Sequence, residues 1–312
     1  MPVARRYTEV LIFVVVWMAA GWIFHLDVNA YLLLGFPLVV LFQLFIARRP
    51  LRNLWVRDAT TFRLGLVGIV LAALLILAPG YGLFFVALPT KSWVVASWFL
   101  CAMAGTVFAA FALSQQRASA ARQGLPSFIA ALLLGIATTA TIAISTHHSI
   151  GFPLPKLLFL VKQFLLYFTV CFAVEEVVFR GALDSHVYQP RSGGQASNGS
   201  PWLSAIFVST LWGIWHLPTA PVSSASAFAA VIPFVIVVHT LSGVPLCFCW
   251  RASGTLVLPA AAHGHIMFGE CLPMRSDSLL LHGAVVHSRC HCFARIWNWA
   301  AAVWAVRLEM DW

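Results

Sequence analysis

Long apolar runs alternate with short polar connections along most of the chain. Each run holds few charges and is close to the length of a bilayer-spanning helix, which needs about 20 residues for a core of about 30 Å. This pattern predicts an all-α fold, a polytopic membrane helix bundle with about eight transmembrane helices. The apolar runs lie near 8–26, 29–47, 64–88, 93–113, 127–146, 156–175, 202–218, 226–250 and 254–269, with a weaker run near 293–308.

The composition supports a membrane protein and excludes a soluble one. Of 312 residues, 61% are hydrophobic and only 9% are charged, whereas soluble globular proteins carry about 25% charged residues. The net charge of +9 comes largely from basic residues in short connections, where they set membrane orientation. We therefore expect the lipid bilayer as a partner and no nucleic acid.

Basic residues also predict which side of the membrane each connection faces. Arg5 and Arg6 precede the first run, and five more arginines lie in the connection 48–63. The positive-inside rule places both groups in the cytoplasm. Counting spans from there brings the end of the sixth run, at Glu175, back to the cytoplasmic side. The sequence thus predicts an integral, multi-pass membrane protein with a cytoplasmic N-terminus.

Two neighbouring glutamates interrupt this apolar pattern. No acidic residue lies between Asp58 and Glu175, and Glu176 follows at once. An ionisable residue in a membrane segment is costly and is a functional candidate by default. Glu176 and Arg180 share one helix face and can pair, whereas Glu175 is rotated about 100° away. Glu176 is then a structural residue and Glu175 is available for chemistry; the alternative is a plain ion pair at a helix end.

Histidines occur in three later apolar runs. His216 ends the segment "WGIWH", and "LPAAAHGH" carries His263 and His265. A carboxylate can take a proton from water, and histidines can orient that water or bind a metal. The alternative for His216 is a ring that only bonds a neighbouring backbone carbonyl. For His239 that satisfied role is the expectation, and lining the site is the alternative.

These segments, in this order, resemble the CAAX protease and bacteriocin-processing family of intramembrane endopeptidases. "EEVVFR" fits the EExxxR motif of the family, and "WGIWH" fits its FxxxH motif with Trp212 in place of the aromatic Phe. "GTLVLPAAAH" is similar to the segment that ends on the third-motif histidine. The resemblance covers about residues 156–266. It implies an endopeptidase site between membrane helices, with Trp212 in a supporting position.

The resemblance also implies a role for each matched residue. Glu175 would activate the attacking water with the assistance of His216, and His263 would stabilise the oxyanion or hold the water. Glu176 and Arg180 would brace the site. As metal ligands, Glu175, His216 and His263 would suit Zn²⁺, but they suit a metal-free site equally, so no cofactor is fixed. The implied substrate is a peptide or a prenylated protein.

The chain departs from the family pattern after the third motif. The family places Asn or Asp four residues after the third histidine, whereas counting from His263 gives Met267 and counting from His265 gives Gly269. A missing oxyanion donor lowers a rate on the order of 10²–10³-fold. The alternative function is therefore a catalytically weak or inactive member that acts as a membrane scaffold or partner-binding protein.

The sequence divides one membrane domain into three regions. Residues 1–150 are expected to form N-terminal transmembrane helices, and residues 151–268 a CAAX-protease-like core. From residue 269 the composition changes, and histidines and cysteines gather in a formerly apolar chain. We expect residues 269–312 to be a divergent C-terminal tail.

Overall fold

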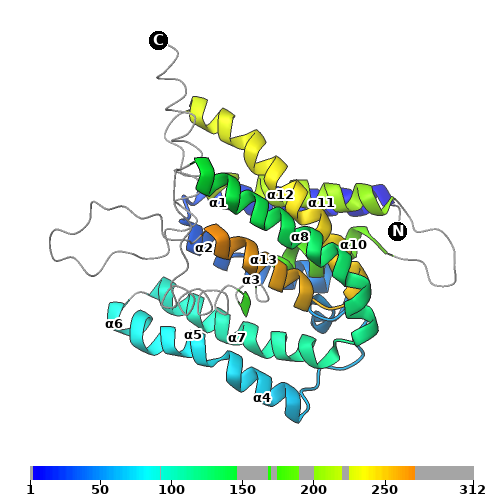
Figure 1. The fold of residues 1–312 in the computed structure, drawn as a ribbon. Coiled ribbons are helices and arrows are strands. Elements are labelled where there is room, and N and C mark those ends of the chain that lie inside the picture. The colour runs from blue at the N-terminus through cyan, green and yellow to red at the C-terminus, as the bar shows by residue number, and fades with distance from the viewer. Residues whose placement is uncertain are drawn as a thin grey trace.

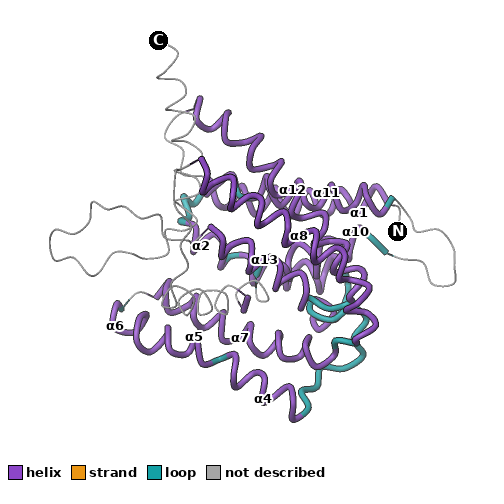
Figure 2. The backbone as a smooth tube through the Cα atoms, viewed as in Figure 1, coloured by secondary structure: helices purple, strands orange, loops and turns teal. Residues whose placement is uncertain are grey.

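The chain folds almost entirely into helices (Figures 1 and 2). The structure is a computed structural model and describes residues 3–91, 93–145, 168–169, 174–189, 200–219 and 225–270. Within these ranges there is no β-strand, and one isolated antiparallel bridge joins Val56 to Thr255. The predicted all-α class is confirmed. The tail beyond residue 270 lies outside the described residues.

The first part of the chain forms short and long helices that turn back on one another. Of these, η1 and η3 are π-helical and η2 is a 3-10 helix. Their bounds are α1 Val3–Ile23, α2 Val28–Leu33, α3 Gly35–Leu41, η1 Phe42–Ile46, η2 Leu51–Leu54, α4 Leu66–Leu75, α5 Leu77–Gly82, η3 Leu83–Ala87, α6 Leu88–Thr90, α7 Trp93–Gln115 and α8 Ala118–Ser145.

The second part carries the three motifs. Here η4 is a π-helix and η5 is a 3-10 helix. The bounds are η4 Val177–Asp184, α10 Ser185–Val187, α11 Pro201–Trp215, η5 Leu217–Thr219, α12 Ala225–Ser253 and α13 Val257–Glu270.

Several helical segments are long and apolar enough to cross a membrane. The polytopic membrane bundle is therefore confirmed, and the protein is an integral membrane protein. The total of about eight spans stays a prediction, because most of the run 156–175 lies outside the described residues. Among the described residues, five segments meet the length and composition of a span: Val3–Ile23, Leu66–Phe85, Val95–Gln115, Ala118–Thr138 and Ile232–Ser253.

The run near 29–47 forms a short apolar helical stretch, Ala30–Ile46, with an interruption between α2 and α3. In the structure it is divided into α2, α3 and η1. Pro37 lies in the first turn of α3 and has no N–H to donate, and its ring clashes with a helical carbonyl four residues earlier. That carbonyl belongs to Leu33, the residue at which α2 ends. The break is therefore a local consequence of one proline.

The helices form two groups in Figure 1. One contains α8, α11, α12 and α13, with α8 packed on both α12 and α13. The other contains α4, α5 and α7, drawn in cyan. At the crossing of α11 and α12, a side-chain carbon on Gly213 would come within 2.8 Å of the Ile236 Cα atom. Glycine therefore permits the two backbones to approach closely, as small residues do between membrane helices.

A buried aromatic cluster fixes α1 and α2 to the end of α11. The Trp17 indole N–H donates to the Tyr31 carbonyl at 3.0 Å, and the Tyr31 hydroxyl donates to the Trp215 carbonyl at 2.8 Å. The Trp17 and Trp215 rings meet edge to face at 4.9 Å. The polar groups of Trp17 and Tyr31 therefore have partners, as buried aromatic N–H and O–H groups usually do.

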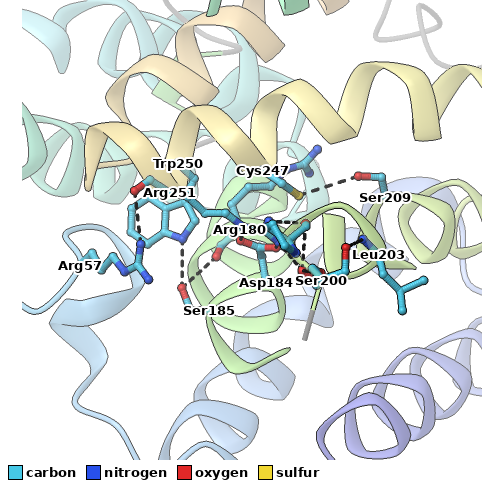
Figure 3. A network of polar contacts seen from close by, with 12 residues as sticks. Arg57, Arg180, Asp184, Ser185, Ser200, Leu203, Ser209, Cys247, Trp250 and Arg251 are labelled. Atoms are coloured by element: carbon cyan, nitrogen blue, oxygen red, sulfur yellow. Dashed lines mark hydrogen bonds and ion pairs between the residues drawn. The ribbon is translucent and has the colours of Figure 1, made fainter. Parts of the chain in front are cut away.

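A buried ion pair joins η4 to α12 (Figure 3). Arg251 donates to both carboxylate oxygens of Asp184, at 2.9 and 2.5 Å, and the two side chains are only 7% and 1% exposed. The same guanidinium donates to the Pro201 carbonyl and to the Ser204 hydroxyl, at 2.6 and 2.9 Å. One arginine therefore holds three helical segments together.

We expect Arg251→Gln to destabilise the fold by about 3–5 kcal/mol, because it leaves the Asp184 carboxylate buried without a cation. Unfolding in mixed micelles measures this loss, and Arg122→Gln, which removes an exposed arginine, is the control. The double variant Arg251→Gln/Asp184→Asn should recover part of the stability. Equal unfolding of Arg251→Gln and the control would show that this pair does not support the fold.

Candidate functional site

The two glutamates stand immediately before η4, with Glu176 at the position that precedes its first residue. Segments with π-helical hydrogen bonds occur frequently at functional sites. Gly181 lies in this segment against η2, where an added side-chain carbon would collide with the Leu54 carbonyl oxygen. The glycine therefore permits the close contact that seats η4 in the bundle.

Glu176 lies at the centre of a buried polar cluster. Its Oε1 atom is 3.4 Å from the Arg180 Nη1 atom, one turn later on the same segment. The same oxygen accepts a hydrogen bond from the His263 Nδ1 atom of α13 at 2.8 Å. Both Glu176 and Arg180 have an exposed fraction of 0%. The expected pairing of Glu176 with Arg180 is therefore present, and Glu176 also binds the third-motif segment.

Glu175 is held by residues from other helices. Its Oε2 atom accepts a hydrogen bond from the Trp212 indole N–H at 3.1 Å and lies 3.7 Å from the His263 Nε2 atom. Glu175 retains 8% exposure, whereas its neighbour Glu176 has none. The two adjacent carboxylates thus have different surroundings, and the less enclosed one is Glu175.

Trp212 contacts Glu175, Arg180 and the rings of three histidines. The Arg180 guanidinium lies over its ring at 4.4 Å, a cation–π distance. The rings of His239 and His263 meet it edge to face at 4.7 and 5.0 Å. From the motif, Trp212 was expected only to replace the aromatic ring of Phe. The structure adds a function that Phe lacks, because only the indole donates a hydrogen bond to Glu175.

His216 and His239 share one chemical feature. The His216 Nδ1 atom lies 2.8 Å from the Trp212 carbonyl, and the His239 Nδ1 atom lies 2.8 Å from the Val235 carbonyl. A carbonyl only accepts, so Nδ1 carries the proton in each ring, and a neutral ring then has its lone pair on Nε2. The two ring centroids are 4.2 Å apart. The site therefore contains two adjacent imidazoles with basic Nε2 atoms.

The sequence left two roles open for these histidines: a bond to a backbone carbonyl, or a place in the site. The structure shows features of both. His216 and His239 each bond a carbonyl in their own helix, as a satisfied membrane histidine does. Yet His239 also lies against the rings of Trp212 and His216. The sequence did not predict that His239 packs on His216. The two residues are 23 positions apart on different helices, so no spacing within one helix relates them.

For the residues from 265 to 270, the structure describes the helix but not the side chains. Helix α13 continues to Glu270 and includes His265, Met267 and Gly269. The side chains of these residues lie outside the described part of the structure. The absence of a polar side chain four residues after His263 therefore stays a sequence observation.

The sequence predicts Glu175, His216 and His263 as zinc ligands only if the protein is a zinc enzyme. No group of three or more His, Cys, Asp or Glu side chains within the described residues is arranged to hold a metal ion. In the set of Glu175, His216 and His263, the His263 Nδ1 atom is bound to Glu176 and its Nε2 atom is 3.7 Å from Glu175. No metal site is assigned to these residues, and no proposed step passes through a metal.

Residues 157–268 match a protein family model described as Type II CAAX prenyl endopeptidase Rce1-like. The match confirms the family resemblance that the three motifs indicated over about residues 156–266. No curated protein and no solved structure matches the chain. The match supports an intramembrane endopeptidase with a peptide substrate in a lipid environment. The matched range contains Glu175, Glu176, Arg180, Trp212, His216, His239 and His263.

We expect Trp212→Phe to lower peptide cleavage about tenfold, because it removes one hydrogen bond to a charged group, which contributes about 1.5–3 kcal/mol. The matched control is Trp215→Phe, because the buried Trp215 indole N–H has no hydrogen-bond partner within the described residues. Steady-state cleavage rates in detergent measure both variants. Equal losses would assign the effect to ring packing rather than to the hydrogen bond.

Proposed function

We propose that the chain is an intramembrane endopeptidase of the CAAX prenyl protease type, in which Glu175 activates the attacking water. The observation that carries this proposal is the contrast between two adjacent carboxylates. Glu176 is enclosed by Arg180 and His263, whereas Glu175 is fixed by one indole N–H and keeps some exposure. A held but accessible carboxylate is the arrangement that a general base needs.

In the proposed reaction, the Glu175 carboxylate takes a proton from water, and the hydroxide formed attacks the carbonyl carbon of the scissile peptide bond. The π electrons of the C=O bond move to its oxygen, which becomes an anion. His263, protonated on both nitrogens, donates Nδ1–H to Glu176 and stabilises the oxyanion from Nε2. Before the proton transfer, the charges of Glu175, Glu176, Arg180 and this imidazolium sum to zero. After it, Glu175 is neutral and the oxyanion carries the negative charge, so the buried site stays neutral throughout.

The second half of the proposed reaction breaks the C–N bond. The carbonyl re-forms as the electron pair of that bond moves to the leaving nitrogen. The proton that Glu175 took from water passes to this nitrogen, giving an amine and a carboxylic acid. His216 orients the water through its Nε2 lone pair in the first step. His239 packs against His216 and holds that ring in place.

We also propose a prenylated protein as the substrate and a cytoplasmic location for the glutamate end of the site. Two contacts support a shared side for this end and the basic connections. Arg49 donates to the Ser185 carbonyl at 2.9 Å, just past η4, and His186 lies 2.8 Å from Glu9 near the N-terminus. The catalytic core is proposed to be residues 151–268.

We expect Glu175→Gln to lower cleavage of a farnesylated CaaX peptide by about 10²–10⁴-fold, the typical contribution of a general base. Purified full-length protein in detergent is compared with the variant at saturating peptide. The matched control is Asp58→Asn, an exposed carboxylate at positive φ of 56°, where Asn is tolerated. The control should cleave at the wild-type rate.

Two other results of this cleavage experiment would contradict the proposal. Cleavage retained in Glu175→Gln would remove Glu175 as the base. If the wild type cleaves neither this peptide nor a broad set of membrane peptides, the endopeptidase proposal fails. The inactive scaffold is then the remaining function, and a cellular effect unchanged in Glu175→Gln would support it.

For His239, we expect Ala and Phe substitutions to behave differently. His239→Ala removes the ring that packs on His216 and Trp212 and should lower kcat about tenfold with little change in KM, because a small misplacement of a reacting group is costly. His239→Phe keeps a ring there and should restore most of kcat. Equal losses in both variants would instead assign the effect to the imidazole nitrogens.

A further inference from the structure

A groove on the membrane-facing side of the bundle lies between α1 and the α3–η1 segment. Its volume is about 670 Å³, within the range of about 300–1,000 Å³ typical of small-molecule sites. It is separate from the glutamate and histidine site. The groove is lined by Arg5, Glu9, Ile12, Phe13, Val16, Leu38, Leu41, Phe42, Phe45, Ile46 and Arg48.

The lining has a polarity gradient along the helices. On α1 the charged residues Arg5 and Glu9 come first, and the lining continues with apolar residues to Val16. On the returning segment the apolar residues come first, and the charged residue, Arg48, comes last. Because the charged ends of the two lining stripes are the start of α1 and the residues just after η1, the charges gather at one end of the groove.

The apolar part of the groove is open. The lining residues Ile12, Val16, Leu41 and Phe45 are 56%, 54%, 51% and 69% exposed. In a membrane this surface faces acyl chains rather than water. A groove with an apolar length and a charged end matches an amphiphile with one polar headgroup.

The charged end favours an anion. Two arginines and one carboxylate line this end, and the Arg5 Nε atom donates to Glu9 at 2.8 Å. The Arg48 side chain is exposed and makes no hydrogen bond or ion pair with another described residue. Guanidinium groups bind phosphate with paired N–H donors. A phosphate at this end would therefore find a guanidinium with its donors available.

Neighbouring residues add to the positive potential at this end. Burial lowers the pKa of His186, Glu9 raises it, and the guanidinium groups of Arg49 and Arg6 lower it further. Arg6 is itself buried, and its Nη1 atom has no hydrogen-bond partner within the described residues. Near this end, the four arginines Arg5, Arg6, Arg48 and Arg49 therefore outnumber the two carboxylates, Glu9 and Asp58.

We propose that this groove binds one anionic phospholipid, with its phosphate at Arg5 and Arg48 and an acyl chain along Val16, Leu41 and Phe45. Basic pockets between membrane helices on the cytoplasmic side bind anionic headgroups in this way. This site is independent of the proposed peptidase reaction. Glu9 connects it to His186 of α10, the segment that follows η4, at 2.8 Å.

Native mass spectrometry of the purified full-length protein tests the proposal with phosphatidylglycerol and phosphatidylcholine of identical chains. Phosphatidylglycerol should fill one site at a concentration at least about fivefold lower, since each nearby basic residue contributes about 1 kcal/mol to anionic lipid attraction. Arg48→Gln should remove about that factor, and Arg48→Lys should keep most of it. The control Arg63→Gln, an exposed arginine outside the groove, should bind as the wild type does.

A second variant tests the apolar part without changing charge. Val16→Trp fills the groove and should prevent the tight phosphatidylglycerol binding, with thermal unfolding in lipid-free detergent showing that the variant is folded. Equal binding of the two lipids, an equal loss in Arg63→Gln, or unchanged binding in Val16→Trp would each overturn the proposal. Displacement of phosphatidylglycerol by a farnesylated peptide at lower concentration would assign the groove to a peptide and would also overturn it.

Discussion

A carboxylate without exposure in a membrane protein must be neutralised by the protein itself, and Glu176 imposes that constraint on this fold. Its Oε1 atom meets Arg180 at 3.4 Å and His263 at 2.8 Å. Glu176 immediately precedes η4, Arg180 lies within it, and His263 belongs to α13, which is far away in the chain. An ion left alone in this environment would cost several kcal/mol. These contacts therefore fix η4 relative to α13. Because Glu175 is the neighbour of Glu176, its position is fixed as well.

At the other end of η4, the buried carboxylate of Asp184 is likewise neutralised by a cation of the protein. Asp184 is bound through both oxygens to Arg251, which also reaches the start of α11 (Figure 3). The π-helical segment is thus fixed by a buried charge near each end, with Gly181 against η2 between them. A segment fixed in this way holds Glu175 at a defined position relative to α11 and α12, which is what positional catalysis requires.

Aromatic rings complete the site between these two charge clusters. Trp212 lies under Arg180, bonds Glu175 and contacts His239 and His263. Large rings exclude water from the buried charges and strengthen their interactions, because the local dielectric falls. The same rings fix the orientation of the histidines that contact them. Burial, charge compensation and the proposed chemistry therefore depend on one set of packed side chains.

The sequence by itself determined the all-α membrane class, the pairing of Glu176 with Arg180 and the residues of the three motifs, because helical periodicity and span length are local properties. Only the tertiary structure decided that the Trp212 indole donates to Glu175, that His239 packs on His216, and that Asp184 meets Arg251 across 67 positions. These contacts arise where helices cross. The crossing depends on close approaches such as the one at Gly213, and no spacing within a single helix encodes which residues then face each other.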